Sequence, residues 1–142
     1  MRAHLFQRGR TMIVHPTNQT TAGFYLDSEP YLLIEDQSPA GIGAALRSAL
    51  AAFRTGIHPP LRHEYPLRPV SPLQKRMAGY RGARLVSIEQ KEGFAFVPHL
   101  NGGGKGPNRG YHGIPEKKIL APASADDTAL GDACLRALAL CE

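Results

Sequence analysis

The sequence predicts an α/β (α+β) fold in which one mixed or mainly antiparallel sheet of about five to six strands is packed by two main helices. Three observations support this prediction. The 142 residues are 42% apolar and 20% charged, which suits a single domain over residues 1–142 with a sizeable core. Segments 40–53 and 125–141 have apolar residues at helical spacing. Short β-prone runs precede each of these segments.

The first third of the chain contains three candidate strands. Thr11–His15 is a short apolar, β-prone run, and we expect Pro16 to end it. Gly23–Asp27 and Tyr31–Glu35 are two further strand-like runs separated by a turn or bulge. Because residues Tyr31–Ile34 of the second run are all apolar, we expect this run to be a central strand covered on both faces.

The first main helix has a clear start signal. Ser38 suits the N-cap position, and Pro39 suits the first helical position. Gly56 is expected to end the helix. Apolar residues recur at intervals of three and four along one face: Ile42, Ala45, Leu46, Ala49, Leu50 and Phe53.

Two segments are rich in proline or glycine. Residues 57–72 contain five prolines, so we expect an extended crossing over the surface. Ser71 and the proline after it repeat the helix start signal and predict a short helix through Met77. Residues 101–113 contain six glycines and predict a mobile loop.

The remaining elements complete the predicted sheet and its second helix. Arg84–Gln90 alternates apolar and polar residues, which predicts a strand with one face in water. Phe94–Pro98 follows a turn at Lys91–Gly93 and is expected to be its hairpin partner. Lys117–Leu120 predicts a last short strand, and 125–141 predicts the closing helix.

The charge is distributed unevenly along a chain whose formal net charge is +5. Residues 54–118 carry twelve Lys or Arg and four Asp or Glu. By contrast, all charged residues of 23–38 and 124–132 are acidic. No apolar run approaches the roughly 18 residues of a membrane span, so we expect no membrane association. The N-terminus lacks a secretory pattern, which favours a cytoplasmic location.

The sequence predicts no cofactor, no metal site and no assembled catalytic site. Gly102–Gly106 lacks the helix start and the hydroxyl residue of a phosphate-binding loop. The six histidines have no helical metal-ligand spacing, and His58 and His63 lie in the proline-rich crossing. Cys134 and Cys141 are too far apart along one helix for a disulfide, so we expect reduced, structural thiols.

Two nucleic-acid hypotheses remain open on the basic region. A metal-free ribonuclease could use His112, Lys105 and Arg109 as base, acid and phosphate clamp. A small RNA-binding protein could use the same three residues to bind RNA phosphates, with Tyr80 and Tyr111 as stacking surfaces for nucleobases.

An acidic cluster offers a third hypothesis. Asp27, Glu29, Glu35 and Asp36 fall at the ends of two neighbouring candidate strands. They are either solvated strand ends or a patch that mimics phosphate and docks on a basic protein.

The stretch from Thr20 to Pro30 resembles a known family, and the layout around it does so too. Val14-His15-Pro16 precedes this stretch, and the helix with Ile42–Leu50 follows it. With the proline-rich crossing and a closing helix containing Leu130-Gly131, the chain resembles the CdiI-type immunity proteins of contact-dependent growth inhibition systems.

This resemblance implies a small bacterial cytoplasmic protein that is not an enzyme. It would bind one cognate toxin C-terminal domain, a nuclease acting on tRNA or another RNA, as a 1:1 heterodimer and occlude its active site. Direct nucleic-acid binding is then not expected. The toxin-binding candidates are Tyr25, Asp27, Glu29, Tyr31, Glu35 and Asp36. Because inhibitors of basic nucleases tend to be acidic, the charge of +5 leaves open whether the acidic segments or the basic region 54–118 forms the docking face.

Overall fold

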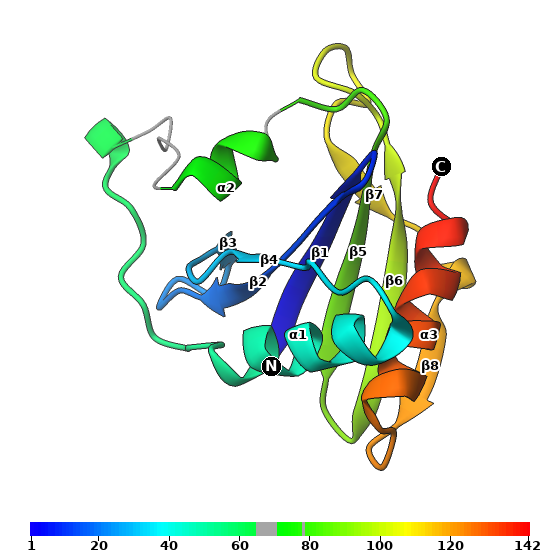
Figure 1. Ribbon diagram of the computed structural model, residues 1–142. Coiled ribbons are helices and arrows are strands. Elements are labelled where there is room, and N and C mark those ends of the chain that lie inside the picture. The colour runs from blue at the N-terminus through cyan, green and yellow to red at the C-terminus, as the bar shows by residue number, and fades with distance from the viewer. Residues whose placement is uncertain (65–70, 78) are drawn as a thin grey trace.

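The computed structural model describes residues 1–64, 71–77 and 79–142, and Figure 1 shows their arrangement. The elements follow one another as β1 (Arg2–Arg8), β2 (Thr11–Gln19), β3 (Tyr25–Asp27), β4 (Leu32–Leu33), α1 (Pro39–Ala51), η1 (Arg62–Glu64), α2 (Pro72–Arg76), β5 (Ala83–Gln90), β6 (Gly93–Asn101), β7 (Tyr111–Gly113), η2 (Pro115–Lys117), β8 (Ile119–Pro122) and α3 (Asp127–Ala139).

The strands form one curled antiparallel sheet. Its main order is β3-β2-β1-β5-β6-β7, with β4 also paired to β2 and β8 also paired to β6. The N-terminal strand β1 lies in the middle, between β2 and β5 (Figure 1). The predicted α+β class with a mainly antiparallel sheet and two main helices is confirmed.

Helices α1 and α3 pack against each other and cover one face of this sheet (Figure 1). Glycines allow the two helices to touch closely. A Cβ atom on Gly43 of α1 would lie 1.8 Å from the Asp127 carbonyl oxygen, and one on Gly131 of α3 would lie 1.8 Å from the Pro39 carbonyl oxygen. Each helix therefore places a glycine against the first turn of the other.

The core lies between the helices and the sheet. Alternate strand residues point into it, because successive side chains of a strand face opposite sides. The strands contribute these pairs: Ala3 and Leu5 from β1, Met12 and Val14 from β2, Val86 and Ile88 from β5, and Phe94 and Phe96 from β6. A smaller cluster of Phe6, Ala83 and Leu85 belongs to the opposite face.

The first strands differ from the sequence-based expectation. We did not predict β1, and the strand expected to stop at Pro16 continues to Gln19. Pro16 is tolerated because it lies between the part of β2 that pairs with β4 and the part that pairs with β3, where no strand partner needs its missing N–H. There, the Pro16 carbonyl accepts a hydrogen bond from Ser28 N at 3.0 Å.

The expected central strand over Tyr31–Glu35 is also a wrong prediction. Only Leu32 and Leu33 form a strand, β4, and it lies at the sheet edge against β2, with Leu33 39% exposed. Tyr31 and Ile34 are buried on either side of this short strand. The strand covered on both faces is β2, whose residues 12–18 are all buried.

The helix start signals are confirmed. The Ser38 side chain accepts from Gly41 N, and the Ser71 side chain accepts from Gln74 N in the short helix α2. Much of the proline-rich crossing, residues 65–70, lies outside the described residues. The glycine-rich segment holds an ordered turn, since Gly102 N donates to Gly110 O and Gly110 N donates to Gly103 O, both at 2.8 Å. None of the described helices has the length and apolarity needed to cross a membrane.

Candidate functional site

The sheet face away from the helices carries a group of polar side chains. Since Ala3 and Leu5 point into the core, His4 between them points to the opposite face. In the strand register, His4 lies beside His15 of β2 on one side and Ser87 of β5 on the other. His99 of β6 lies beyond Ser87, and its Nε2 is 2.7 Å from the Ser87 Oγ.

Asp27 of β3 joins the two histidines of β1 and β2. Its Oδ1 lies 2.9 Å from His4 Nδ1 and 3.9 Å from His15 Nδ1. The two imidazole rings meet edge to face, with centroids 5.7 Å apart. We refer to His4, His15 and Asp27 as the histidine cluster, in which one potential ligand atom from each residue lies within 4.8 Å of the others.

The pKa values of two residues in the histidine cluster are shifted by burial and by their neighbours. His15 is 0% exposed, and Tyr31 covers it with ring centroids 4.9 Å apart. Burial lowers the pKa of His15, although the nearby Asp27 acts in the opposite direction. Partial desolvation raises the pKa of Asp27, but the His4 hydrogen bond and the charges of both histidines outweigh it, so this pKa lies below its usual value.

A small cavity of about 210 Å³ opens beside His4. Its wall includes Thr17, Tyr25, Ser87 and His99. Burial lowers the pKa of His99 to about 4, so this imidazole is neutral near pH 7. Among the described residues, the Thr17 Oγ1 and the His15 Nε2 are buried without a hydrogen-bond partner. The cavity can hold a small polar ligand or an ion.

The acidic residues singled out in the sequence lie in one segment at the sheet edge but have different roles. Asp27 is paired with His4. Asp36 Oδ1 accepts a hydrogen bond from Ser38 N at 3.0 Å and so supports the start of α1. Glu29 and Glu35 are exposed. Within the described part of the chain, these last two carboxylates form no hydrogen bond or ion pair.

The two tyrosines of the same segment are placed differently. Tyr25 is half-buried, and the Arg2 guanidinium lies 4.0 Å from its ring centroid. Tyr31 is only 8% exposed and packs over His15. Burial, with a contribution from Asp27 and Glu29, raises the pKa of the Tyr31 phenol. Of the two rings, Tyr25 therefore presents more surface to a partner.

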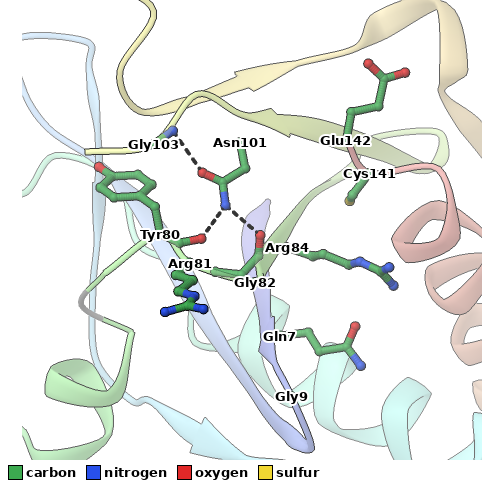
Figure 2. Close-up of a pocket in the computed structure, with 11 residues that line it drawn as sticks. Gln7, Gly9, Tyr80, Arg81, Gly82, Arg84, Asn101, Gly103, Cys141 and Glu142 are labelled. Carbon is green, nitrogen blue, oxygen red and sulfur yellow. Dashed lines mark hydrogen bonds between the residues drawn. The ribbon is translucent and has the colours of Figure 1, made fainter. Parts of the chain in front are cut away.

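A larger cavity of about 730 Å³ lies where the β1–β2 turn, the chain before β5 and the C-terminus meet (Figure 2). Asn101 holds its wall together: its amide donates to Tyr80 O at 2.5 Å and to Ala83 O at 2.8 Å, and its Oδ1 accepts from Gly103 N at 3.0 Å. Arg81 and Arg84 also line it.

Two exposed arginines line this larger cavity, with their guanidinium groups extending in different directions (Figure 2). Arg81 and Arg84 are exposed, and neither forms an ion pair with a described carboxylate. The nearby Glu142 is instead paired with Lys117. Free guanidinium groups at a cavity wall suit a phosphate or carboxylate group. The sequence analysis missed this cavity because its lining comes from segments that only the sheet register brings together.

The proposed ribonuclease residues lie in or beside the glycine-rich loop, where His112 contacts the loop backbone. His112 Nε2 lies 3.0 Å from Asn108 O and 3.1 Å from Arg109 O. Among the described residues, no hydrogen bond or ion pair joins the side chains of Lys105, Arg109 and His112. The two tyrosines expected to stack on bases, Tyr80 and Tyr111, contact each other with centroids 5.1 Å apart.

The histidine cluster is the feature that sequence reasoning missed. His4, His15 and Asp27 have neither the helical spacing nor a local motif that identifies metal ligands in a sequence. A signal does exist, because two alternating strands joined by the short turn at Gly9-Arg10 place residues 4 and 15 opposite each other. Finding that signal requires predicting β1.

Comparisons with known proteins support the fold. No family profile matches the sequence, and no curated protein matches it. A solved protein of unknown function from Neisseria meningitidis superposes with a TM-score of 0.74 at 12% identity, over 99% of this chain and 94% of that one. A chain of the CdiA-CT/CdiI toxin and immunity complex from Yersinia pseudotuberculosis gives 0.70 at 13% identity, over 99% and 97%. At these identities the likeness is one of fold.

Proposed function

We propose that this chain is an immunity protein that binds a toxin domain and neutralises it. The observation that supports this proposal is the fold likeness to a chain of a toxin and immunity complex, which covers 99% of this chain and 97% of the other. The alignment spans nearly all of both chains, so the likeness is not confined to one part of the fold.

We assign toxin binding to the edge of the sheet around β3 and β4. Glu29 and Glu35 would form ion pairs with Lys or Arg side chains of the toxin, and Tyr25 would supply an aromatic contact. Three other residues would position this edge. Asp27 would do so through its pair with His4, and Tyr31 through its packing on His15. Asp36 would do so through its hydrogen bond at the start of α1. The exposed Leu33 of β4 adds apolar surface at the same place.

The proposed mechanism of neutralisation is occlusion of the toxin active site. A nuclease that acts on tRNA or another RNA needs a cationic surface to hold phosphates. Carboxylates at the β3–β4 edge can occupy such a surface in place of phosphate. Inhibition then needs no chemistry from this chain, and one copy of it would neutralise one toxin domain.

A second candidate function, RNA binding, is favoured by the larger cavity. The unpaired guanidinium groups of Arg81 and Arg84 can hold phosphate oxygens. This function predicts RNA affinity that falls steeply with salt and weakens when both arginines are changed to alanine. The same cationic wall is also the alternative docking face for an acidic toxin surface.

The decisive experiment is co-expression with the C-terminal domain of any large adhesin encoded upstream of this chain's gene. We expect rescue of bacterial growth and a co-purifying 1:1 complex. The paired variants Glu29→Ala/Glu35→Ala and Arg81→Ala/Arg84→Ala then separate the two faces. The acidic pair should weaken toxin binding about tenfold or more, whereas the arginine pair serves as the matched control. The absence of both rescue and complex would refute the immunity function, and equal binding by the acidic pair would refute the assigned edge.

A further inference from the structure

We propose that His4, His15 and Asp27 form a binding site for a divalent transition-metal ion of the Zn²⁺ type. The proposal concerns the histidine cluster and does not depend on the toxin-binding role. Two imidazoles and one carboxylate are a donor set that zinc accepts, with further positions left for water or another ligand. The three donors come from three adjacent strands, β1, β2 and β3.

The distances in the cluster are close to those a metal requires. For metal–ligand bonds of about 2.0–2.1 Å and a tetrahedral angle, ligand atoms lie about 3.4 Å apart. Asp27 Oδ1 lies 2.9 Å from His4 Nδ1 and 3.9 Å from His15 Nδ1. Shifts of roughly half an ångström, of the kind that side-chain torsions allow, bring both distances to the tetrahedral value. The ion would replace the proton that His4 now shares with Asp27.

The strand pairing holds the three donor residues in place. His4 and His15 are direct partners in the β1–β2 ladder, and Asp27 is paired with Thr17 in the β2–β3 ladder. His15 is fully buried and fixed further by Tyr31. Ordering these donors therefore costs little entropy when an ion binds, which favours affinity.

On His15 the ligand atom is Nδ1, because this nitrogen lies 3.9 Å from Asp27 Oδ1. The same atom lies 3.1 Å from the Pro16 carbonyl oxygen, so an ion would displace the proton that Nδ1 can donate to this carbonyl. Thr17 provides a second, independent indication of a ligand. Its Oγ1, on the wall of the adjoining cavity, is buried and has no hydrogen-bond partner among the described residues. A water molecule on the ion would give this hydroxyl a partner.

The site is open to solvent on one side. The Asp27 side chain is 46% exposed and the His4 side chain 24% exposed, so an ion can enter without unfolding the sheet. The cavity of about 210 Å³ beside His4 provides room for a water molecule or a small anion on the metal. The simpler interpretation, a hydrogen-bonded His–Asp pair next to a core histidine, leaves the buried Thr17 hydroxyl on the cavity wall without a partner.

The test is titration of the full chain, with any affinity tag removed, with Zn²⁺ against a chromophoric chelator, and with Co²⁺ by its visible absorption. We expect one equivalent of Zn²⁺ to bind, a low-symmetry Co²⁺ spectrum of high intensity, and an upward shift in the unfolding temperature with Zn²⁺. The variants Asp27→Asn and His4→Gln change partly exposed residues and keep hydrogen-bonding capacity. Each should weaken Zn²⁺ binding about tenfold or more.

The matched control is His112→Gln, because His112 is an exposed histidine outside the cluster. It should bind Zn²⁺ like the unchanged chain. Circular dichroism of every variant verifies that the fold is retained. The proposal is overturned if the unchanged chain binds no Zn²⁺, or if Asp27→Asn and His4→Gln bind it as tightly as the His112→Gln control.

Discussion

The glycine contacts between α1 and α3 lead to a quantitative prediction for Gly131→Ala. The new Cβ would lie 1.8 Å from the Pro39 carbonyl oxygen, whereas a carbon and an oxygen normally approach to about 3.3 Å. Because the Cβ is fixed rigidly to the backbone of one helix and the oxygen belongs to the backbone of the other, no side-chain rotation can relieve the clash. The helices would have to separate locally by roughly 1.5 Å, which opens the core beneath them.

Two effects of opposite sign determine the magnitude of this change. Alanine in place of glycine stabilises a helix interior by about 1 kcal/mol. Overpacking of a tight contact costs about 1–3 kcal/mol and more when backbone must move. We expect the steric cost to win, with a net loss of about 2 kcal/mol and a decrease in unfolding temperature of roughly 6 °C.

Urea and thermal unfolding followed by circular dichroism measure this loss. Gly43→Ala should behave alike, because its Cβ would lie 1.8 Å from the Asp127 carbonyl oxygen. Ala44→Gly is the control, since Ala44 is exposed on α1 and should lose only the helix propensity, about 1 kcal/mol. If Gly131→Ala is as stable as the unchanged protein or more so, the close helix contact does not exist as described.

Three further predictions concern caps, pH and thiols. Ser38→Ala should lower the free energy of unfolding by about 1 kcal/mol in urea titrations, whereas Ser71→Ala should change it little, because α2 has no buried residues. The free energy of unfolding should decrease as the pH falls from about 6.5 to 4. The reason is that His99 stays neutral in the folded protein over this range, whereas the same histidine takes up a proton in the unfolded chain. In unfolding experiments at several pH values, His99→Gln should show a shallower decrease. Burial raises the pKa of the Cys134 thiol to about 12, so iodoacetamide at pH 8 should label Cys141 first by mass spectrometry, and early labelling of Cys134 would contradict its burial.

The predictable elements of this fold carry their own local signals. Ser38 and Pro39 predict the start of α1. The alternation of apolar and polar residues predicts β5, and the turn after it predicts its hairpin partner β6. These signals depend on residues within one or two turns of each other. The same reasoning failed for β1, whose charged and polar residues at positions 2, 4, 7 and 8 conceal the buried ones between them.

The candidate sites were harder to predict because they depend on register between distant segments. The acidic residues 27–36 were found as a cluster in the sequence, but only the structure shows that Asp27 and Asp36 already have partners. The larger cavity combines Arg81 and Arg84 with the C-terminal Glu142. No local pattern connects positions so far apart, so such sites follow only after the strand order is known.

The central position of β1 also has a consequence for how the chain folds during synthesis. One side of β1 pairs with β2 in a local hairpin, but the other side waits for β5, which lies about eighty residues later. One edge of β1 stays uncovered until residues 83–90 have left the ribosome, and the α3-binding side of α1 stays uncovered until residues 127–139 follow. Because closing such a long loop is slow, the nascent N-terminal half passes through a stage with an exposed strand edge that can aggregate. Chaperone contact with this nascent segment would protect that edge until the second half of the sheet arrives.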